Sequence, residues 1–361
     1  MSKKLGIITS GGDAPGLNAV IRAIVKASAL RDWQCIGFLG GFEGLLDPPA
    51  YRELDYHVLG SLLYRGGTVL GTSNRGHFAA KSGHGQINHI PDDVIENSKR
   101  TVASLELDAL ICIGGDGSLT IAQQLFEAGI PVVGVPKTID NDLQATLMTF
   151  GFETAVACAV DALDRLHTTA ESHNRVMVLE VMGRHAGWIA LQAGLAGGAD
   201  VILIPEIPFD YAAICAKIAA RDADGKLFTI VVVAEGACPH DGQIMTQGSA
   251  QADREVRMGG IGAQVTAEIE QRSGRESRCV VLGHLQRGGA PSPWDRQLCT
   301  RFGVLAVQQV ADGNFGCMIA LTPSGMAPVK LTDAIARVHR VTPDHEMVQV
   351  CRALGVCMGD A

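Results

Sequence analysis

The stretch ALICIGGDGS, residues 109–118, runs from five apolar residues directly into two glycines and an aspartate. A short continuous apolar run of this kind is typical of a strand buried on both faces, and the glycines predict a tight turn. A helical pattern follows over residues 119–128, and residues 131–135 form another apolar run. A strand, a helix and a second strand in this order predict a parallel sheet with a helix packed on it.

The same alternation continues along most of the chain in both directions. The predicted strands are residues 5–9, 35–39, 109–113, 131–135, 176–181, 201–204, 228–234, 279–282 and 318–321. The predicted helices are residues 17–30, 119–128, 154–168, 185–196, 211–221, 261–271 and 295–310. Residues 79–92 predict a loop, and residues 236–260 predict a polar, glycine-rich excursion. We therefore expect an α/β fold of parallel sheets that helices cover on both faces.

Length, charge and cysteine usage disfavour several classes of protein. The chain has 361 residues, which suggests two domains at roughly 150 residues each. Its formal net charge of −8 disfavours a non-specific nucleic-acid binder, which needs a basic surface. No apolar run approaches the roughly 18 residues of a membrane-spanning helix, and we expect no secretion signal. Ten cysteines without a C-x-x-C pair are typical of a reduced, cytoplasmic protein.

In parallel sheets ligands bind at the carboxyl ends of the strands, so the residues that follow each strand are candidate site residues. Gly11 and Gly12 follow the first predicted strand and precede a helix. Free backbone N–H groups and the positive end of the helix dipole favour an anion there. A plain tight turn explains the same glycines equally well.

The turn after residues 109–113 contains Gly115, Asp116 and Gly117. A carboxylate at a strand end, flanked by glycines, can hold Mg²⁺ beside a phosphate chain that the glycine amides bind. This pattern is fairly specific for nucleotide phosphates. The alternative is that Asp116 caps the following helix.

Residues 136–142, PKTIDND, follow the strand at 131–135 and carry two carboxylates two positions apart. Asp140 and Asp142, beside a lysine and a threonine, are costly to place near bound phosphate unless a metal or a proton transfer uses them. A surface turn rich in Asp and Asn is an equally good explanation of this segment alone.

Cations mark the edges of the later strands. Arg175 and Arg184 flank one predicted strand, and Arg278, His284 and Arg287 flank another. Each arginine alone is explained by a solvated surface or an ion pair. Four arginines and one histidine at strand edges of an acidic chain predict a phosphate clamp, because guanidinium groups bind phosphate bidentately.

Together these segments resemble the 6-phosphofructokinase family. They occur in the family's order from residue 5 to about residue 310, and this order is far more specific than the GGDG element, which NAD and lipid kinases share. The segments are SGGDAPGLN, RGGTVLGTSNRG, IGGDGS, PKTIDND, GFETA, SHNRVMVLEVMGRHAG, GGADVILIPEI, VVAEG and VLGHLQRGG. The resemblance implies two parallel-sheet α/β domains with the active site in the cleft between them.

The resemblance implies phosphoryl transfer from ATP, with Mg²⁺, to the 1-hydroxyl of fructose 6-phosphate, a step of glycolysis that gives fructose 1,6-bisphosphate. Asp140 matches the general base, Arg184 a cation that stabilises the transition state, and Asp116 the Mg²⁺ ligand. The catalytic set is Asp140, Arg184, Thr138, Gly117 and Lys137. The nucleotide contacts match Gly11, Gly12, Arg75, Gly115, Asp116, Gly117 and Ser118. The sugar-phosphate contacts match Thr138, Ile139, Asp140, Asp142, Arg175, Met182, Gly183, Arg184, Glu235, Arg278, His284, Leu285, Gln286 and Arg287.

The resemblance also implies how the chain is divided and assembled. Residues 1–151 and about 286–336 match a nucleotide-binding domain, and residues from about 152 to 285 and 337–361 match a sugar-phosphate-binding domain. In the family the arginines that match Arg175 and Arg278 belong to the site of a neighbouring subunit. This implies a cytoplasmic homo-oligomer, commonly a tetramer with a dimer as the alternative, that needs no nucleic acid or membrane.

Two residues give opposite indications about the phosphoryl donor. Gly117 matches ATP users, because the Asp of pyrophosphate users would fill the space of the α-phosphate. Lys137 matches pyrophosphate users, whereas typical bacterial ATP enzymes have Gly there. We expect ATP, because the glycine permits the α-phosphate while the lysine only adds charge, and pyrophosphate stays the alternative. A long-chain subgroup of ATP enzymes resembles this mixture.

The effector site of the bacterial ATP enzymes is matched only in part. Arg22 is kept, Lys26 replaces an arginine, and His167 stands where another arginine is expected. Regulation by ADP or phosphoenolpyruvate therefore stays open. Two other classes are disfavoured: a dinucleotide oxidoreductase lacks its G-x-G-x-x-G helix start here, and a non-catalytic homologue would lack some of the catalytic residues that this chain retains.

Overall fold

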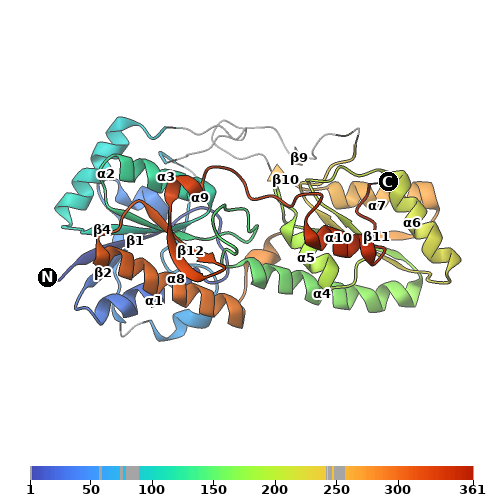
Figure 1. Ribbon diagram of the computed structural model, residues 1–361, viewed down its shortest axis with the longest axis horizontal. Coiled ribbons are helices and arrows are strands. Elements are labelled where there is room, and N and C mark those ends of the chain that lie inside the picture. Colours follow the sequence, from blue (N-terminus) through green and yellow to red (C-terminus); the bar gives the residue numbers. More distant parts are fainter. Residues whose placement is uncertain are drawn as a thin grey trace.

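The structure is a computed structural model, and it describes residues 2–56, 59–73, 76–78, 89–240, 242, 246–247 and 257–360. Two lobes lie side by side, each built on its own sheet (Figure 1). One sheet has seven strands and the other has four. Arg75 and residues 79–88 of the predicted loop lie outside the described residues, as does most of the predicted excursion at 236–260.

The seven-stranded sheet has the order β13-β12-β5-β4-β1-β2-β3. Its inner strands are parallel, and both edge strands pair antiparallel with their neighbours. The strands are β1 (Lys4–Thr9), β2 (Gln34–Phe38), β3 (Tyr51–Glu53), β4 (Ala109–Gly114), β5 (Val132–Pro136), β12 (Cys317–Thr322) and β13 (Gly325–Lys330). The predicted strands of this sheet are therefore parallel as expected, and two strands that were not predicted, β3 and β13, extend it antiparallel at its edges.

Helices cover both faces of this sheet, because its central strands are apolar on both sides. The helices α1 (Leu17–Ala29) and α8 (Pro293–Asp312) form one core with the sheet. The helices α2 (Asp92–Ser104), α3 (Asp116–Glu127) and α9 (Leu331–Ala334) form the other. Short 3-10 helices η1 (Gly41–Leu45) and η3 (Gly60–Tyr64) lie in the connections.

The four-stranded sheet has the order β11-β6-β8-β7 and is parallel throughout. Its strands are β6 (Val176–Val181), β7 (Val201–Leu203), β8 (Thr229–Ala234) and β11 (Ser277–Val281). One face packs against α4 (Phe152–His173), α5 (Trp188–Ala196) and α10 (Glu346–Ala353), and the other against α6 (Tyr211–Ala223) and α7 (Ile261–Ser273). A 3-10 helix, η4 (Gly283–Arg287), follows β11, and β9 (Thr246–Gln247) pairs with β10 (Arg257–Met258).

All nine predicted strands are confirmed, with bounds within two residues. The seven predicted helices are also confirmed, although α3 begins three residues earlier than predicted and α4 ends five residues later. The predicted helix at 185–196 begins later, at Trp188. The reason is a tight turn before it: Gly183 has a φ of 140°, and a Cβ at Gly187 would lie 2.4 Å from the Cβ of Ile204. No prediction covered the helices α2, α9 and α10 or the strands β3, β9, β10 and β13.

One glycine pair has a different role from the one its sequence suggests. Paired glycines at strand ends predict backbone that approaches a ligand closely. A Cβ at Gly66 would instead lie only 2.0 Å from the carbonyl oxygen of Gly289. This glycine therefore allows two backbone segments of the chain itself to pack together.

The segment between α9 and α10, residues 335–345, crosses from the first lobe to the second (Figure 1). We call it the strap. Beyond α10, Cys357 pairs with Val201 beside β7, and the carbonyl of Gly359 accepts a hydrogen bond from Asp210 N at 2.7 Å. The last residues of the chain thus complete the second lobe. Among the described residues, no helix has the length and apolar character to cross a membrane.

Candidate active site

The turn between β4 and α3 places Asp116 as the first residue of α3, with Gly115 as the N-cap. The alternative that Asp116 is the helix cap is therefore not realised. A Cβ at Gly114 would lie 2.2 Å from the Cβ of Ser118, and one at Gly115 would lie 3.1 Å from the Lys137 carbonyl. A Cβ at Gly117 would meet nothing within 4 Å. A side chain at Gly114 would therefore collide with Ser118, and one at Gly115 would be crowded by Lys137. A side chain at Gly117 would enter open space.

The glycine turn after β1 meets the end of β5. Gly11 has a φ of 81°, and a Cβ there would lie 3.2 Å from Ser118 Oγ and 3.3 Å from Lys137 Nζ. Lys137 Nζ donates a hydrogen bond to the carbonyl of Gly12. The predicted nucleotide residues Gly11, Gly12 and Ser118 therefore lie close to Lys137, the residue that matches pyrophosphate users.

Lys137 is 4% exposed, and its burial governs its charge. Its pKa is lowered from 10.5 to about 8, mainly by burial and also by the nearby Arg287 guanidinium, while the carboxylates of Asp140, Asp142 and Asp13 act to raise it. The ammonium form is therefore close to its titration point at neutral to mildly alkaline pH. A bound phosphate would favour the charged form.

Thr149 and Thr138 shape the segment that carries Asp140. Thr149 Oγ1 donates to the carbonyl of Thr138 at 2.6 Å, and Thr149 N donates to Asn141 Oδ1 at 2.9 Å. Asp140 N donates to Thr138 Oγ1 at 3.1 Å. Asn141 adopts a φ of 52°, a left-handed conformation that asparagine tolerates. These contacts fix the turn on which Asp140 stands.

Two other predicted residues of this segment have distinct environments. Burial and the charge of Asp140 raise the pKa of Asp142. The side chain of Ile139 is fully buried in the core of the second lobe. The segment thus combines one apolar anchor with two acidic groups that repel each other.

The other side of the site comes from the carboxyl ends of β6 and β8. Gly236 N donates to the carbonyl of Gly183 at 3.1 Å, and a Cβ at Gly236 would lie 2.1 Å from the carbonyl oxygen of Arg184. Burial raises the pKa of Glu235, the Asp140 charge raises it further, and the Arg184 charge opposes this. Asp140, Arg184 and Glu235 therefore share one electrostatic environment, although they follow strands of different sheets.

The η4 segment joins these two sides. Arg287 Nη1 donates to the carbonyl of Asp13 at 3.1 Å, and a Cβ at Gly12 would lie 2.8 Å from the same nitrogen. Gln286 is buried, and its Oε1 accepts a hydrogen bond from Met182 N at 3.3 Å. Leu285 is 69% exposed. His284, Arg287 and Met182 thus lie at the same strand edge as Arg184.

Arg175 and Arg278 lie at the opposite, amino edge of the four-stranded sheet. Arg278 pairs with Met177 in the β11–β6 register, near the start of both strands. Because a strand advances about 3.3 Å per residue, the length of β6 separates them from Arg184 by roughly 20 Å. Both arginines contact Glu276, with N–O distances of 2.7 and 2.5 Å. One chain therefore brings only part of the predicted phosphate clamp together.

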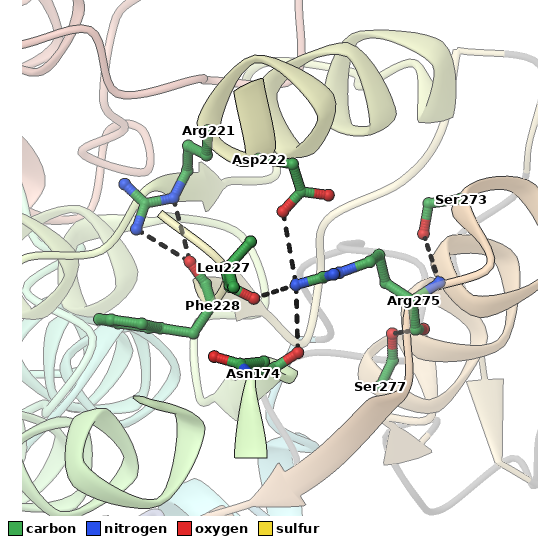
Figure 2. A network of polar contacts seen from close by, with 8 residues as sticks. All are labelled: Asn174, Arg221, Asp222, Leu227, Phe228, Ser273, Arg275 and Ser277. Carbon is green, nitrogen blue, oxygen red and sulfur yellow. Dashed lines mark hydrogen bonds and ion pairs between the residues drawn. The ribbon is translucent and has the colours of Figure 1, made fainter. Parts of the chain in front are cut away.

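The amino edge also holds a polar network that the sequence analysis did not predict (Figure 2). Arg275 donates to the backbone carbonyls of Asn174, at 3.2 Å, and Leu227, and it lies 3.4 Å from a carboxylate oxygen of Asp222. Arg221 donates to the carbonyl of Phe228 through two nitrogens, at 3.2 and 2.9 Å. These arginines tie the starts of β6, β8 and β11 together.

Two residues that depart from the bacterial effector site have contacts of their own. Lys26 Nζ lies 5.2 Å from the centre of the Tyr56 ring, and His167 Nε2 lies 2.7 Å from the carbonyl oxygen of Gly197. Arg22 lies one helical turn before Lys26 on α1. Within one chain, His167 on α4 belongs to the other lobe.

One contributor to this region was missed entirely. His339 of the strap contacts the backbone of Asn141, 198 residues earlier in the chain. No local sequence pattern around residue 339 carries a signal of this contact, because it depends on how the strap crosses between the lobes.

Comparisons with known proteins agree with the sequence motifs. The sequence model of a family described as phosphofructokinase matches residues 4–310. An ATP-dependent 6-phosphofructokinase of Chloroflexus aggregans is 52% identical over 358 residues, which cover 99% of this chain and 98% of that protein. A pyrophosphate–fructose 6-phosphate 1-phosphotransferase of Amycolatopsis methanolica is 48% identical over 344 residues, 94% of this chain and 97% of that protein.

Solved structures have the same fold. A phosphofructokinase of Pichia pastoris in the T-state matches with a TM-score of 0.80 and 31% identity, over 93% of this chain and 36% of that one. A pyrophosphate-dependent phosphofructokinase of Marinobacter aquaeolei matches with a TM-score of 0.80 and 21% identity, over 99% of this chain and 92% of that one. The two-lobed parallel-sheet architecture is therefore common to all of them.

Proposed function

The chain belongs to the phosphofructokinase family, and we propose that it transfers the terminal phosphoryl group of ATP to the 1-hydroxyl of fructose 6-phosphate. The observation that carries this proposal is the shared electrostatic environment of Asp140, Arg184 and Glu235 beside the glycine turns. In this proposal the base and the cation, from two sheets, act in one site. The product is fructose 1,6-bisphosphate, so the reaction is a step of glycolysis.

The chemistry asks for positioning and charge neutralisation. Asp140 accepts the proton of the 1-hydroxyl as its oxygen attacks the terminal phosphorus of ATP, and the bond from that phosphorus to the ADP oxygen breaks. Arg184 and the N–H groups of the glycine turns stabilise the charge on the moving phosphoryl group. Thr138 supports Asp140 through its hydrogen bond to Asp140 N.

The residues around Asp116 fit Mg²⁺. No group of three or more acidic, histidine or cysteine side chains that could hold a metal occurs among the described residues. Mg²⁺ suits a single carboxylate because it keeps waters and takes substrate phosphates as its other ligands. When bound, the ion would neutralise phosphate charge. Asp116, at the start of α3 beside the open space at Gly117, offers the carboxylate oxygens for it.

The sugar-phosphate half of the site requires a second chain in this proposal. His284 and Arg287 would bind the 6-phosphate from the carboxyl edge of one chain, and Arg175 and Arg278 would reach the same phosphate from the amino edge of its neighbour. Met182, Gly183 and Glu235 would contact the sugar. Glu276 supports this arrangement, because it holds both amino-edge arginines together at the surface. The enzyme is then a homo-oligomer, and we propose a tetramer.

The division into domains follows the two sheets in this proposal. Residues 1–151 and about 286–336 form the nucleotide-binding domain, and residues from about 152 to 285 and 337–361 form the sugar-phosphate-binding domain. The pairing of β12 with β5 supports the return of the chain to the first domain. We propose a cytoplasmic location, which the ten free cysteines of the chain support.

The donor assignment has a specific test. Pyrophosphate is the alternative donor, and the buried Lys137 beside Gly12 favours it. Gly117→Asp places a carboxylate in the open space of the α-phosphate, so we expect ATP turnover to fall at least about a hundredfold through lost volume and charge repulsion.

Steady-state kinetics of wild type and Gly117→Asp with ATP, ADP and pyrophosphate provide the measurement. Gly117→Ala is the matched control, because it adds a Cβ without a carboxylate and should lower ATP turnover far less than Gly117→Asp. A wild-type enzyme that works faster with pyrophosphate than with ATP contradicts the assignment and makes Lys137 the better indicator.

A further inference from the structure

The proposed catalytic groups follow strands of different sheets. Some contact between the two lobes must therefore fix the distance between Asp140 and Arg184. Asp140 follows β5 of the seven-stranded sheet, and Arg184 follows β6 of the four-stranded sheet. A displacement of about 1 Å between reacting groups can reduce turnover by roughly a hundredfold. The strap, which crosses between the lobes, contacts both sides through His339.

On the Asp140 side, His339 contacts two consecutive carbonyl groups. Its backbone N–H donates to the carbonyl of Asp142 at 2.8 Å, and its ring Nδ1 lies 3.2 Å from the carbonyl oxygen of Asn141. A carbonyl oxygen only accepts, so this hydrogen bond requires the proton on Nδ1. His339 therefore holds the backbone directly after Asp140.

On the Arg184 side, His339 contacts the start of α5. Trp188 Nε1 donates to the carbonyl of His339 at 3.0 Å, and the two rings stack with centroids 4.8 Å apart. Trp188 is buried and is the first residue of α5, which begins directly after the turn that carries Arg184. One strap residue thus touches both catalytic segments.

Glu206 fixes the strap beside the same helix. Gly187 N donates to both carboxylate oxygens of Glu206, at 3.0 and 3.1 Å, and Val341 N donates to Glu206 Oε1 at 2.9 Å. The carboxylate joins the N-terminus of α5 to the strap two residues beyond His339. The position of His339 is therefore defined from the α5 side independently of the Asp140 segment.

We propose that His339 is a positioning residue for the phosphoryl transfer, and that its Nδ1–H sets the Asp140 segment relative to the Arg184 turn. The inference rests on the proposed function, which it deepens. The imidazole acts through the backbone of Asn141 and has no contact with the reacting atoms in this scheme. Its loss should therefore lower kcat while KM for both substrates changes little.

Two substitutions separate the two contacts of the ring. His339→Phe keeps a ring on Trp188 and removes the donor, and we expect kcat to fall roughly tenfold with both KM values within about twofold. His339→Asn removes the stacked ring but supplies an amide N–H near the former Nδ1, so it should restore kcat to within about threefold of wild type.

His345→Phe is the matched control within the same strap. The His345 ring also packs on Trp188, edge-on at 5.1 Å, and its Nδ1 accepts a hydrogen bond from Met347 N rather than holding the Asp140 segment. We expect wild-type kcat for this variant. A wild-type kcat in His339→Phe, or an equal loss in His345→Phe, overturns the proposal.

Hydrogen exchange distinguishes a failure of this inference from a failure of the proposed function. If wild type phosphorylates fructose 6-phosphate with none of the three donors, the proposed function fails, while the connection itself is still measurable. Backbone amides over residues 138–143 should exchange faster in His339→Phe than in His345→Phe. Equal exchange in the two variants overturns the role of His339, whatever the activity of the wild type.

Discussion

Each edge of the four-stranded sheet carries a glutamate beside arginines, and the pKa values of the two glutamates are shifted in opposite directions. At the carboxyl edge, burial raises the pKa of Glu235, beside Arg184. At the amino edge, the pKa of Glu276 is lowered, first by its hydrogen bond with Arg175. Burial thus makes the Glu235 carboxyl harder to ionise, whereas the neighbouring arginines favour the ionised form of Glu276.

This difference shows that the number of arginines at strand edges is not enough to predict a phosphate-binding site. The contacts of each arginine within the chain also have to be known. Arg275 and Arg278 are three residues apart in the sequence. Arg275 donates to the carbonyls of Asn174 and Leu227, beside Asp222 (Figure 2). Arg278 is 51% exposed, and it contacts Glu276 and the carbonyl of the adjacent Ser277. The contacts of Arg275 are structural, whereas we propose that Arg278 acts in the site of a neighbouring chain. The following variants test this contrast.

The largest effect should come from Asp140, which follows β5 of the other sheet and faces the carboxyl edge that carries Arg184 and Glu235. Asp140→Asn keeps the shape of the side chain but cannot accept the hydroxyl proton, so we expect kcat to fall about a hundredfold or more while ATP binding is nearly unchanged. Turnover and equilibrium ATP binding are the measurements. Near-normal turnover in this variant would falsify the assignment of the base.

A smaller effect should come from the amino edge. Arg278→Ala removes a charge-assisted contact to the 6-phosphate, so KM for fructose 6-phosphate should rise roughly tenfold with little change in kcat. Arg275→Ala is the matched control: it should lower the melting temperature, because its guanidinium binds backbone carbonyls, and leave KM unchanged.

Mixed oligomers show whether Arg278 acts in the neighbouring site. Neither Asp140→Asn nor Arg278→Ala chains alone should be efficient, but some sites of a mixed oligomer combine an intact Asp140 with an intact Arg278. We expect partial recovery of activity after mixing. No recovery in verified mixed oligomers means that each site is built within one chain and that the contrast between the edges has another cause.

The smallest effect should be a pH dependence that comes from Lys137. Its pKa in the folded chain is about 8, below its ordinary 10.5, so it loses its charge in the folded state as pH rises through about 8. We expect kcat/KM for ATP to fall across this range, because the neutral amine attracts phosphate less. Lys137→Met should lack this pH dependence.

The stability of the free protein should change in the opposite direction over the same range. Between pH 8 and 10.5 the unfolded chain binds more protons at Lys137 than the folded chain, so the free energy of unfolding rises with pH. Denaturant titrations of wild type and Lys137→Met at several pH values measure this contribution. A pH profile of stability that is identical in the two proteins rules out the depressed pKa.

The central strands and the strand-end motifs were predictable because burial on both faces leaves a continuous apolar run. β4 and β8 are fully buried, and both were predicted. The two edge strands of the seven-stranded sheet lack this signal. Tyr51–Glu53 in β3 is exposed along its whole length, and β13 contains Pro328, which an edge strand tolerates but a central strand does not.

The site was predictable where its residues follow strands, and it was not predictable where the chain supplies a contact from far away. Asp140 and Arg184 carry local motifs and lie where strand ends predict them. His339 lies in a segment with no motif, and its contacts with Asn141 and Trp188 depend on the path of the strap. Sequence periodicity describes faces of helices and strands, and it carries no information about such a crossing.

The return of the chain to the first sheet has a consequence for synthesis on the ribosome. β12 pairs with β5, and α8 packs with α1 in one core, although some 180 to 290 residues separate these partners. When residues 1–151 have left the ribosome, one face of their sheet still lacks α8. The first lobe therefore cannot complete its core until α8 has been translated. Until then its uncovered apolar surface is exposed and can bind chaperones.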